Sequence, residues 1–374
     1  MVKVNPHYER LKRPIIFPVI EQKLKEFKGN DLINLGIGDV ALPLAFDVAQ
    51  AVSAAMVEMS QKPIGYGPAE GYLFLRRALL DEYSNYNIAV DEIFISDGIN
   101  TDLANIADLF DPTCKVATID PGYPVFGDSS LLAGKQVITL PCVEENNFIP
   151  KPPSEKVDVI YLCSPGNPTG VAMTRTDLEM WVAYAQSNDA IILFDAAYAG
   201  FITSPDVPKS IYEIEGAQSV AIEMRSFSKS AGFTGLRCSY SVIPEATGLT
   251  KLWKRRQNTK YNGCSYPVQC GALQALKSEE SSAQVKTYLQ CAGALKEALG
   301  QNVYGGINSP YLWWKVPDGM SSWEFFDVLL QEHHILGIPG VGFGSCGEGF
   351  VRLSAFTTMD KIKEVTNRLG AYAH

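Results

Sequence analysis

The sequence has little histidine, no paired cysteines, no dense basic block and no long apolar run. Only four histidines occur in 374 residues, and none stands in a glycine-rich segment or directly after a strand-like run. Catalysis centred on histidine is therefore not expected. The eight cysteines are scattered, without a C-x-x-C pair or a Cys/His spacing typical of zinc. We expect reduced thiols and no metal site.

Charge and hydropathy exclude further classes of protein. The 32 basic and 41 acidic residues give a net charge of −9, and no cluster of Lys and Arg is dense enough to follow a nucleic-acid backbone. The first residues lack the apolar core of a signal peptide, and no stretch approaches the roughly 18 apolar residues of a membrane span. We expect a cytoplasmic globular protein that binds a small molecule and neither nucleic acid nor a membrane.

Apolar runs of strand length alternate with helix-like segments from about residue 92 onward. This alternation predicts a mostly parallel sheet with helices on both faces. The predicted strands are EIFIS (92–96), KVATID (115–120), QVITLP (136–141), VDVIYLC (157–163), AIILFD (190–195) and SVAIEM (219–224).

The pattern changes near residue 267, where a long helical stretch extends to residue 299. Strand-, helix- and strand-like segments then follow at 311–317, 321–334 and 350–356. A chain of this length favours two domains. We predict a large domain at 46–266 and a smaller α+β domain made of 1–45 and 267–374, joined by a long linking helix.

Polar clusters follow several of the predicted strands directly. They are DPGYP (120–124), SPGNPTG (164–170), DAAY (195–198) and RSFSK (225–229). Because the carboxyl ends of parallel strands meet at one edge of a sheet, we expect these clusters to form a single small-molecule site.

The order and spacing of Asn167, Asp195, Tyr198 and Lys229 resemble the fold-type I pyridoxal-phosphate enzymes of the aspartate aminotransferase superfamily. The resemblance implies an α/β fold with a mostly parallel seven-stranded sheet, a smaller α+β domain and pyridoxal 5'-phosphate as cofactor. It also implies that Lys229 forms a Schiff base with the cofactor and moves the substrate's α-proton. Asp195 would keep the ring nitrogen protonated, which the cofactor needs to act as an electron sink.

Further roles follow from the same resemblance. Asn167 and Tyr198 would hydrogen-bond the ring's phenolic oxygen, and Tyr123 would stack on the ring. Arg352 interrupts a strand-like run, so it is either an edge-strand charge or a clamp for the substrate's α-carboxylate; the resemblance favours the clamp. The cofactor phosphate would be held by Ser226, Ser228, Arg237, the turn at Ile99 and Asn100 before a helix opening at Thr101, and Tyr66 from the neighbouring subunit of a homodimer.

Narrower signatures resemble the LL-diaminopimelate aminotransferase family over nearly the whole chain. LGIGDVALPL (35–44) and FSKSAGFTGLR (227–237) are the more specific of them. By similarity, Gly38 and Asn262 line the substrate pocket together with Arg352 and Asn167.

The chain departs from that family at three positions that, in the family, recognise the far end of the substrate. Asn100 replaces the usual lysine, Ala69 replaces an acidic residue, and Ile15 replaces a tyrosine. An unpaired buried charge costs several kcal/mol, so these changes favour a different amino acid as substrate.

We therefore expect an aminotransferase acting on an L-amino acid whose far end differs from diaminopimelate, with a 2-oxo acid as a possible acceptor. One alternative is a lyase or cyclase that expels a β- or γ-hydroxyl and closes a ring, for example on hydroxyarginine. A second alternative is a true LL-diaminopimelate aminotransferase. A non-catalytic relative is disfavoured because Lys229, Asp195 and Arg352 are all present.

Overall fold

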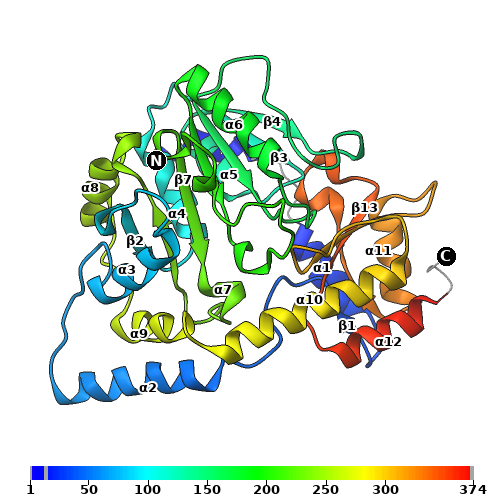
Figure 1. Ribbon diagram of the computed structural model, residues 1–374. Helices are drawn as coiled ribbons and strands as arrows, with labels where there is room; N and C mark the ends of the chain where they lie inside the picture. Colours follow the sequence, from blue (N-terminus) through cyan, green and yellow to red (C-terminus); the bar gives the residue numbers. More distant parts are fainter. Residues whose placement is uncertain (1, 12–15, 371–374) are drawn as a thin grey trace.

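The computed structural model describes residues 2–11 and 16–370, and Figure 1 shows how their helices and strands are arranged. The α-helices are α1 (Ile16–Glu26), α2 (Phe46–Gln61), α3 (Leu73–Leu80), α4 (Ile99–Ile106), α5 (Val125–Leu132), α6 (Arg175–Asn188), α7 (Phe227–Ser230), α8 (Thr250–Lys260), α9 (Tyr266–Ala275), α10 (Glu279–Leu299), α11 (Ser322–Gln331) and α12 (Met359–Leu369). The strands are β1 (Ile33–Asn34), β2 (Ile93–Ser96), β3 (Lys115–Asp120), β4 (Gln136–Pro141), β5 (Val159–Cys163), β6 (Ile191–Asp195), β7 (Ala221–Ser226), β8 (Ser239–Val242), β9 (Val303–Gly305), β10 (Tyr311–Lys315), β11 (Ile335–Leu336), β12 (Ile338–Pro339) and β13 (Phe350–Ser354).

A seven-stranded sheet forms the centre of the larger body, in the order β2-β8-β7-β6-β5-β3-β4. The five strands from β7 to β4 are parallel, and β8 is antiparallel to both of its neighbours. The predicted mostly parallel sheet is confirmed. The sequence analysis missed β8, because its SYSV pattern alternates polar with apolar residues, although all four residues are buried.

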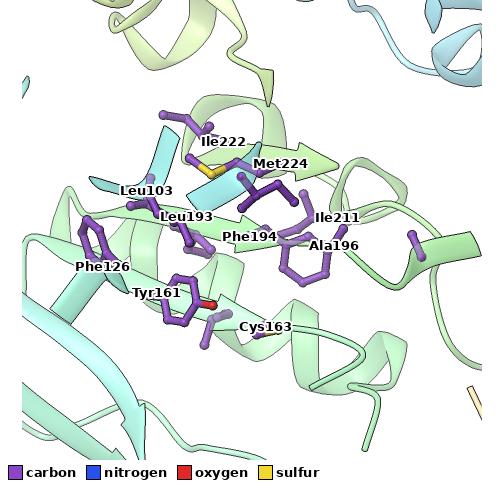
Figure 2. Close-up of a cluster of buried hydrophobic side chains, with 14 of the residues drawn as sticks. Leu103, Phe126, Tyr161, Cys163, Leu193, Phe194, Ala196, Ile211, Ile222 and Met224 are labelled. Atoms are coloured by element: carbon purple, nitrogen blue, oxygen red, sulfur yellow. The ribbon is translucent and has the colours of Figure 1, made fainter. Parts of the chain in front are cut away.

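The core of this body lies on both faces of the sheet. Every residue of β5 is buried, and residues from β6, β7 and α4 pack around Tyr161 and Leu193 (Figure 2). Strands that are buried on both faces read as continuous apolar runs, which is why their sequence signal was strong. The same packing fixes where the strands end, and therefore where the polar segments after them begin.

A second, four-stranded sheet has the order β12-β13-β10-β9, and β1 pairs with β11 beside it. Arg352 lies on β13 between two neighbouring strands, so it is not an edge-strand charge. Both small sheets draw their strands only from residues 33–34 and 303–354. The division into domains 46–266 and 1–45 plus 267–374 stays a prediction, and α9, at the start of the second part, packs against α2 and α3 of the larger body.

Two predicted helix boundaries need correction. The helix expected to open at Thr101 begins at Ile99, because Gly98 precedes it with a φ of 149° and ends the extended segment. The long linking helix is two helices: α9 packs against α2 and α3, and α10 begins after Ser278 caps its first turn. In Figure 1, α10 runs from the larger body to the smaller one. Within the part of the chain that the structure describes, no helix is long and apolar enough to cross a membrane.

Candidate active site

A cavity of about 550 Å³ lies at the carboxyl ends of β5, β6 and β7. It brings together most of the residues that the sequence analysis assigned to one site. These are Gly38, Ile99, Asn100, Tyr123, Asn167, Asp195, Tyr198, Ser226, Ser228, Lys229, Arg237 and Arg352. Ile15 lies outside the described residues, and Tyr66 and Asn262 do not line this cavity.

Lys229 stands in the one-turn helix α7, directly after β7. Ser226 caps this helix by accepting a hydrogen bond from the Ser228 amide. The Lys229 ammonium donates to the Gly38 carbonyl and lies 5.5 Å from the centroid of the Phe356 ring. Burial lowers the pKa of Lys229 to about 8; Asp39 opposes this shift, and Arg352 and Arg237 add to it. A lysine with this pKa is partly neutral near physiological pH, so it can act as a nucleophile and as a base.

Asp195 ends β6 and is almost completely buried. Its carboxylate accepts from Tyr161 Oη at 2.9 Å and from the Ala197 amide at 3.1 Å. Burial raises the pKa of Asp195 to about 6, although both donors favour the ionised form. Neither partner is positively charged, so the site has a buried carboxylate able to pair with a cation of a bound ligand.

Arg352 points from the small sheet into the same cavity. Its guanidinium donates to Asn167 Oδ1 at 2.8 Å and to the Gly36 carbonyl at 2.6 Å. It also lies 4.6 Å from the Tyr311 ring centroid and 4.7 Å from that of Phe343. Its Nε is buried and has no hydrogen-bond partner among the described residues, and the side chain as a whole lines the cavity.

Hydroxyl and guanidinium donors gather where α4 and α7 begin. Arg237 Nη1 donates to Ser228 Oγ at 3.3 Å, and its backbone φ of 65° is in the left-handed region. A Cβ atom added at Gly98 would collide with Arg237 Nη2, so only glycine fits there without moving the arginine. Backbone strain and a required glycine around a cluster of donors are typical of an anion site.

Tyr123 and Asn100 meet across the cavity. Tyr123 Oη donates to Asn100 Oδ1 at 2.7 Å. Burial raises the pKa of Tyr123, so its hydroxyl stays protonated at neutral pH. Asn100 is therefore hydrogen-bonded to the hydroxyl of the tyrosine that is expected to stack on the cofactor.

The structure adds residues that sequence reasoning missed. Tyr161 bonds Asp195 from inside β5, and Tyr311 and Phe343 flank Arg352. Asp39 also lines the cavity, next to Gly38. An aromatic residue inside a predicted strand is usually interpreted as part of the hydrophobic core, so the sequence carried no signal that Tyr161 or Tyr311 belongs to a site. Asp39 stands within the LGIGD signature and could have been singled out there.

Tyr66 and Asn262 lie on adjacent exposed loops. Tyr66 is 92% exposed, and Asn262 is exposed as well. The two loops touch, because a Cβ atom added at Gly263 would lie 2.9 Å from the Pro68 carbonyl oxygen. Within a single chain, these two residues are separate from the cavity.

No group of three or more His, Cys, Asp or Glu side chains that could hold a metal ion occurs in residues 2–11 and 16–370. The polar side chains that line the cavity belong to lysine, arginine, aspartate, asparagine, tyrosine, serine, threonine and cysteine residues.

Comparisons with known proteins identify the family and the fold. The family model described as aminotransferase class I and II matches residues 30–369. An LL-diaminopimelate aminotransferase of Parabacteroides distasonis is 44% identical, with 99% of each chain covered. Another, of Methanosphaera stadtmanae, is also 44% identical, with 99% of this chain and 98% of the relative covered.

Among solved structures, the L,L-diaminopimelate aminotransferase of Chlamydomonas reinhardtii is similar with a TM-score of 0.92. It is 37% identical, and the match covers 100% of this chain and 99% of that one. The fold is therefore the aspartate aminotransferase fold, as predicted. The chain belongs to the aminotransferase class I and II family, and it is a pyridoxal-phosphate-dependent enzyme.

Proposed function

We propose that this enzyme transfers the amino group of LL-diaminopimelate to a 2-oxo acid. The observation that carries the proposal is the 44% identity, over 99% of this chain, to two relatives named for that activity. This similarity favours diaminopimelate over the different donor that Asn100, Ala69 and Ile15 suggested. The cytoplasmic location stays a prediction.

The cavity fits the cofactor of the family. Asp195 is a buried carboxylate with two uncharged partners, and a protonated pyridine nitrogen would supply the missing positive charge. Ser226, Ser228 and Arg237 would hold the phosphate, with the amides of Ile99 and Asn100 at the start of α4. The collision that a Cβ atom at Gly98 would cause supports a close approach of backbone and guanidinium around an anion.

Pyridoxal phosphate, when bound, supplies an aldehyde that joins an amine and a ring that takes up electrons from the amino acid's α-carbon. Lys229 would bind the cofactor through Nζ and, once displaced by the substrate's amine, take the α-proton on Nζ. Asp195 would hold the proton on the ring nitrogen, while Asn167 and Tyr198 hold the phenolic oxygen. The guanidinium of Arg352, which lines the cavity, would help orient the substrate's α-carboxylate.

A different amino donor is the second candidate, and the charges of the cavity favour it. The basic side chains among its described lining residues are Lys229, Arg237 and Arg352, and all three have roles in binding the cofactor or the α-carboxylate. Asn100, where the family usually has lysine, accepts from Tyr123. Within the described residues of one chain, a second carboxylate on the substrate would meet no further cation.

Steady-state kinetics separates the candidates. Purified enzyme would be assayed with LL-diaminopimelate, ornithine, lysine, arginine and hydroxyarginine, each with and without 2-oxoglutarate, and products would be identified by mass. The proposal expects diaminopimelate to have the highest kcat/KM, and a higher value for another donor would overturn it. A polar far-end site can reject a mismatched donor by about four to five orders of magnitude. A guanidino acid that loses water without any 2-oxo acid would instead support the lyase or cyclase reading.

We also propose a homodimer with shared active sites. Tyr66 is exposed and does not line the cavity of its own chain, and Met56 and Val57 of the nearby helix α2 are exposed apolar residues. Burying apolar side chains of this kind favours association. If the partner supplies Tyr66, mixing inactive Tyr66→Ala and Lys229→Ala chains should restore one intact site per mixed dimer. Activity that stays absent after proven subunit exchange would contradict the shared site.

A further inference from the structure

Tyr311 occupies a central place between the two bodies of the molecule. It begins β10 of the small sheet, is 1% exposed and packs in an aromatic cluster with Tyr198, Tyr288 and Phe356. Its hydroxyl lies directly against Gly38, where an added Cβ atom would collide with it. The position of this hydroxyl is therefore fixed from several sides.

Two contacts connect Tyr311 to the reaction centre. Tyr198 Oη donates to Tyr311 Oη at 3.0 Å, and the Tyr311 ring lies 4.6 Å from the Arg352 guanidinium carbon. The hydroxyl and the ring thus reach different partners. The first contact leads to the residue expected to hold the cofactor's phenolic oxygen, and the second leads to the expected carboxylate clamp.

The two hydroxyl groups can exchange roles. A tyrosine hydroxyl both donates and accepts, and rotation of its hydrogen costs little. When an anionic oxygen lies beside Tyr198, the Tyr198 proton turns toward it, and Tyr198 Oη then becomes free to accept from Tyr311. Burial raises the pKa of Tyr198 well above its ordinary value, so Tyr198 remains a donor and does not ionise.

We propose that Tyr311 is a positioning residue that donates to Tyr198 and thereby strengthens the hydrogen bond from Tyr198 to the cofactor's phenolic oxygen. Chained hydrogen bonds polarise one another, so the second donor increases the first donation. The inference rests on the proposed contact of Tyr198 with the cofactor, and it does not depend on which amino acid is the substrate.

The consequence is a change in the basicity of the nitrogen that joins Lys229 to the cofactor. Stabilising the negative oxygen weakens its attraction for the proton on that nitrogen, so the donor chain lowers the nitrogen's pKa. The charged groups facing Lys229 are Asp39, Arg352 and Arg237, and a Tyr311→Phe substitution removes none of them. A change in the pKa of this nitrogen would therefore result from the loss of the Tyr311 hydroxyl and not from the loss of a neighbouring charge.

The test is a pH titration of the visible absorbance of the cofactor-loaded enzyme, without substrate. Tyr311→Phe keeps the ring against Arg352 and should raise the pKa of the absorbance change by roughly half a unit to one unit. Tyr198→Phe should raise it further. The matched control is Tyr288→Phe, because Tyr288 belongs to the same cluster but its hydroxyl accepts from the Leu42 amide. That variant should titrate like the wild type.

The double variant decides whether Tyr311 acts through Tyr198. In a Tyr198→Phe background, Tyr311→Phe should cause no further shift, because the link is already broken. A further shift of the same size would overturn the relay, as would a Tyr311→Phe enzyme that titrates like Tyr288→Phe. If Tyr198→Phe itself leaves the pKa unchanged, the proposed contact of Tyr198 with the cofactor fails as well.

A second perturbation covers the case in which Tyr311→Phe does not bind the cofactor. Gly38→Ala would press a methyl group onto Tyr311 Oη. It should raise the same pKa, and the rise should vanish in a Tyr198→Phe background. A Gly38→Ala enzyme with the wild-type titration, or with a rise that persists in that background, would contradict the proposal.

Discussion

The cofactor end of the cavity and its mouth are built in different ways. At the cofactor end, Asp195, Tyr198 and Arg352 are buried, and each is hydrogen-bonded to a residue of another segment: Asp195 accepts from Tyr161, Tyr198 donates to Tyr311, and Arg352 donates to Asn167. At the mouth, Phe17 is 60% exposed and Ile37 is 56% exposed. The first region is fixed by the ends of strands, and the second is formed by the start of α1 and by a loop.

This difference shows where chemistry and selectivity are located. The cofactor end holds groups whose pKa values are displaced by burial, so small errors in position there are costly. The mouth provides apolar surface in contact with water, where a substitution changes the fit of a substrate without disturbing the acid and base groups. Substitutions at the two ends should therefore differ greatly in effect.

The largest effect is expected for Lys229→Ala. Removing the amine removes both the attachment of the cofactor and the base, so turnover should fall by several orders of magnitude. Covalent cofactor would be measured by mass after chemical reduction, and kcat by steady-state assay. Lys296→Ala is a matched control, because this half-buried lysine donates to the Gly305 carbonyl at 2.7 Å, away from the cavity. A Lys229→Ala enzyme with wild-type turnover would refute the assignment.

The next effect is expected for Asp195→Asn. Breaking a buried ion pair costs about 3–5 kcal/mol, which corresponds to a loss in kcat on the order of a hundredfold to several thousandfold. Tyr161→Phe removes one hydrogen bond to the same carboxylate and should cost much less, about fivefold to tenfold. Comparing kcat for the two variants measures whether the charge or its orientation matters more. Equal losses would contradict the ion-pair role.

Much of the cofactor end could be predicted from the sequence. Strands buried on both faces gave clear apolar runs, and Asp195, Lys229 and Asn167 follow such runs directly. The order of these residues then matched a known superfamily. The family and the fold were confirmed, whereas the individual roles of the residues remain predictions.

The rest of the candidate site could not be predicted from the sequence, because it depends on contacts between segments that are distant in the chain. Tyr161 and Tyr311 are buried strand residues, and only the folded chain shows that their hydroxyls reach Asp195 and Tyr198. The substrate ranking was weaker for a related reason: it relied on Ile15, Ala69 and Asn100 alone. Ile15 lies outside the described residues, and Ala69 does not line the cavity of its own chain.

An intermediate effect is expected for Gly98→Ala. The residue has a φ of 149°, and its new methyl group would displace Arg237 from the proposed phosphate site. Strain of about 1–3 kcal/mol should weaken cofactor binding by about fivefold to 150-fold, as measured by equilibrium dialysis. Gly235→Ala lies in the same segment as Arg237 but meets no atom within 4 Å, so it should bind the cofactor normally. Similar cofactor affinities for both variants would contradict the proposed phosphate site at Gly98 and Arg237.

The smallest effect is expected at the mouth, and two phenylalanines of one cavity provide the comparison. Phe343 is 7% exposed and lies 4.7 Å from the Arg352 guanidinium, so Phe343→Ala should raise KM about tenfold or more by releasing the clamp. Phe17 is largely in water, and Phe17→Ala should change kcat/KM by about threefold or less for small donors. Both variants would be assayed with several donors, with circular dichroism to confirm folding. If Phe17→Ala costs as much as Phe343→Ala, the mouth is as tightly fixed as the cofactor end, and selectivity must be sought in both regions.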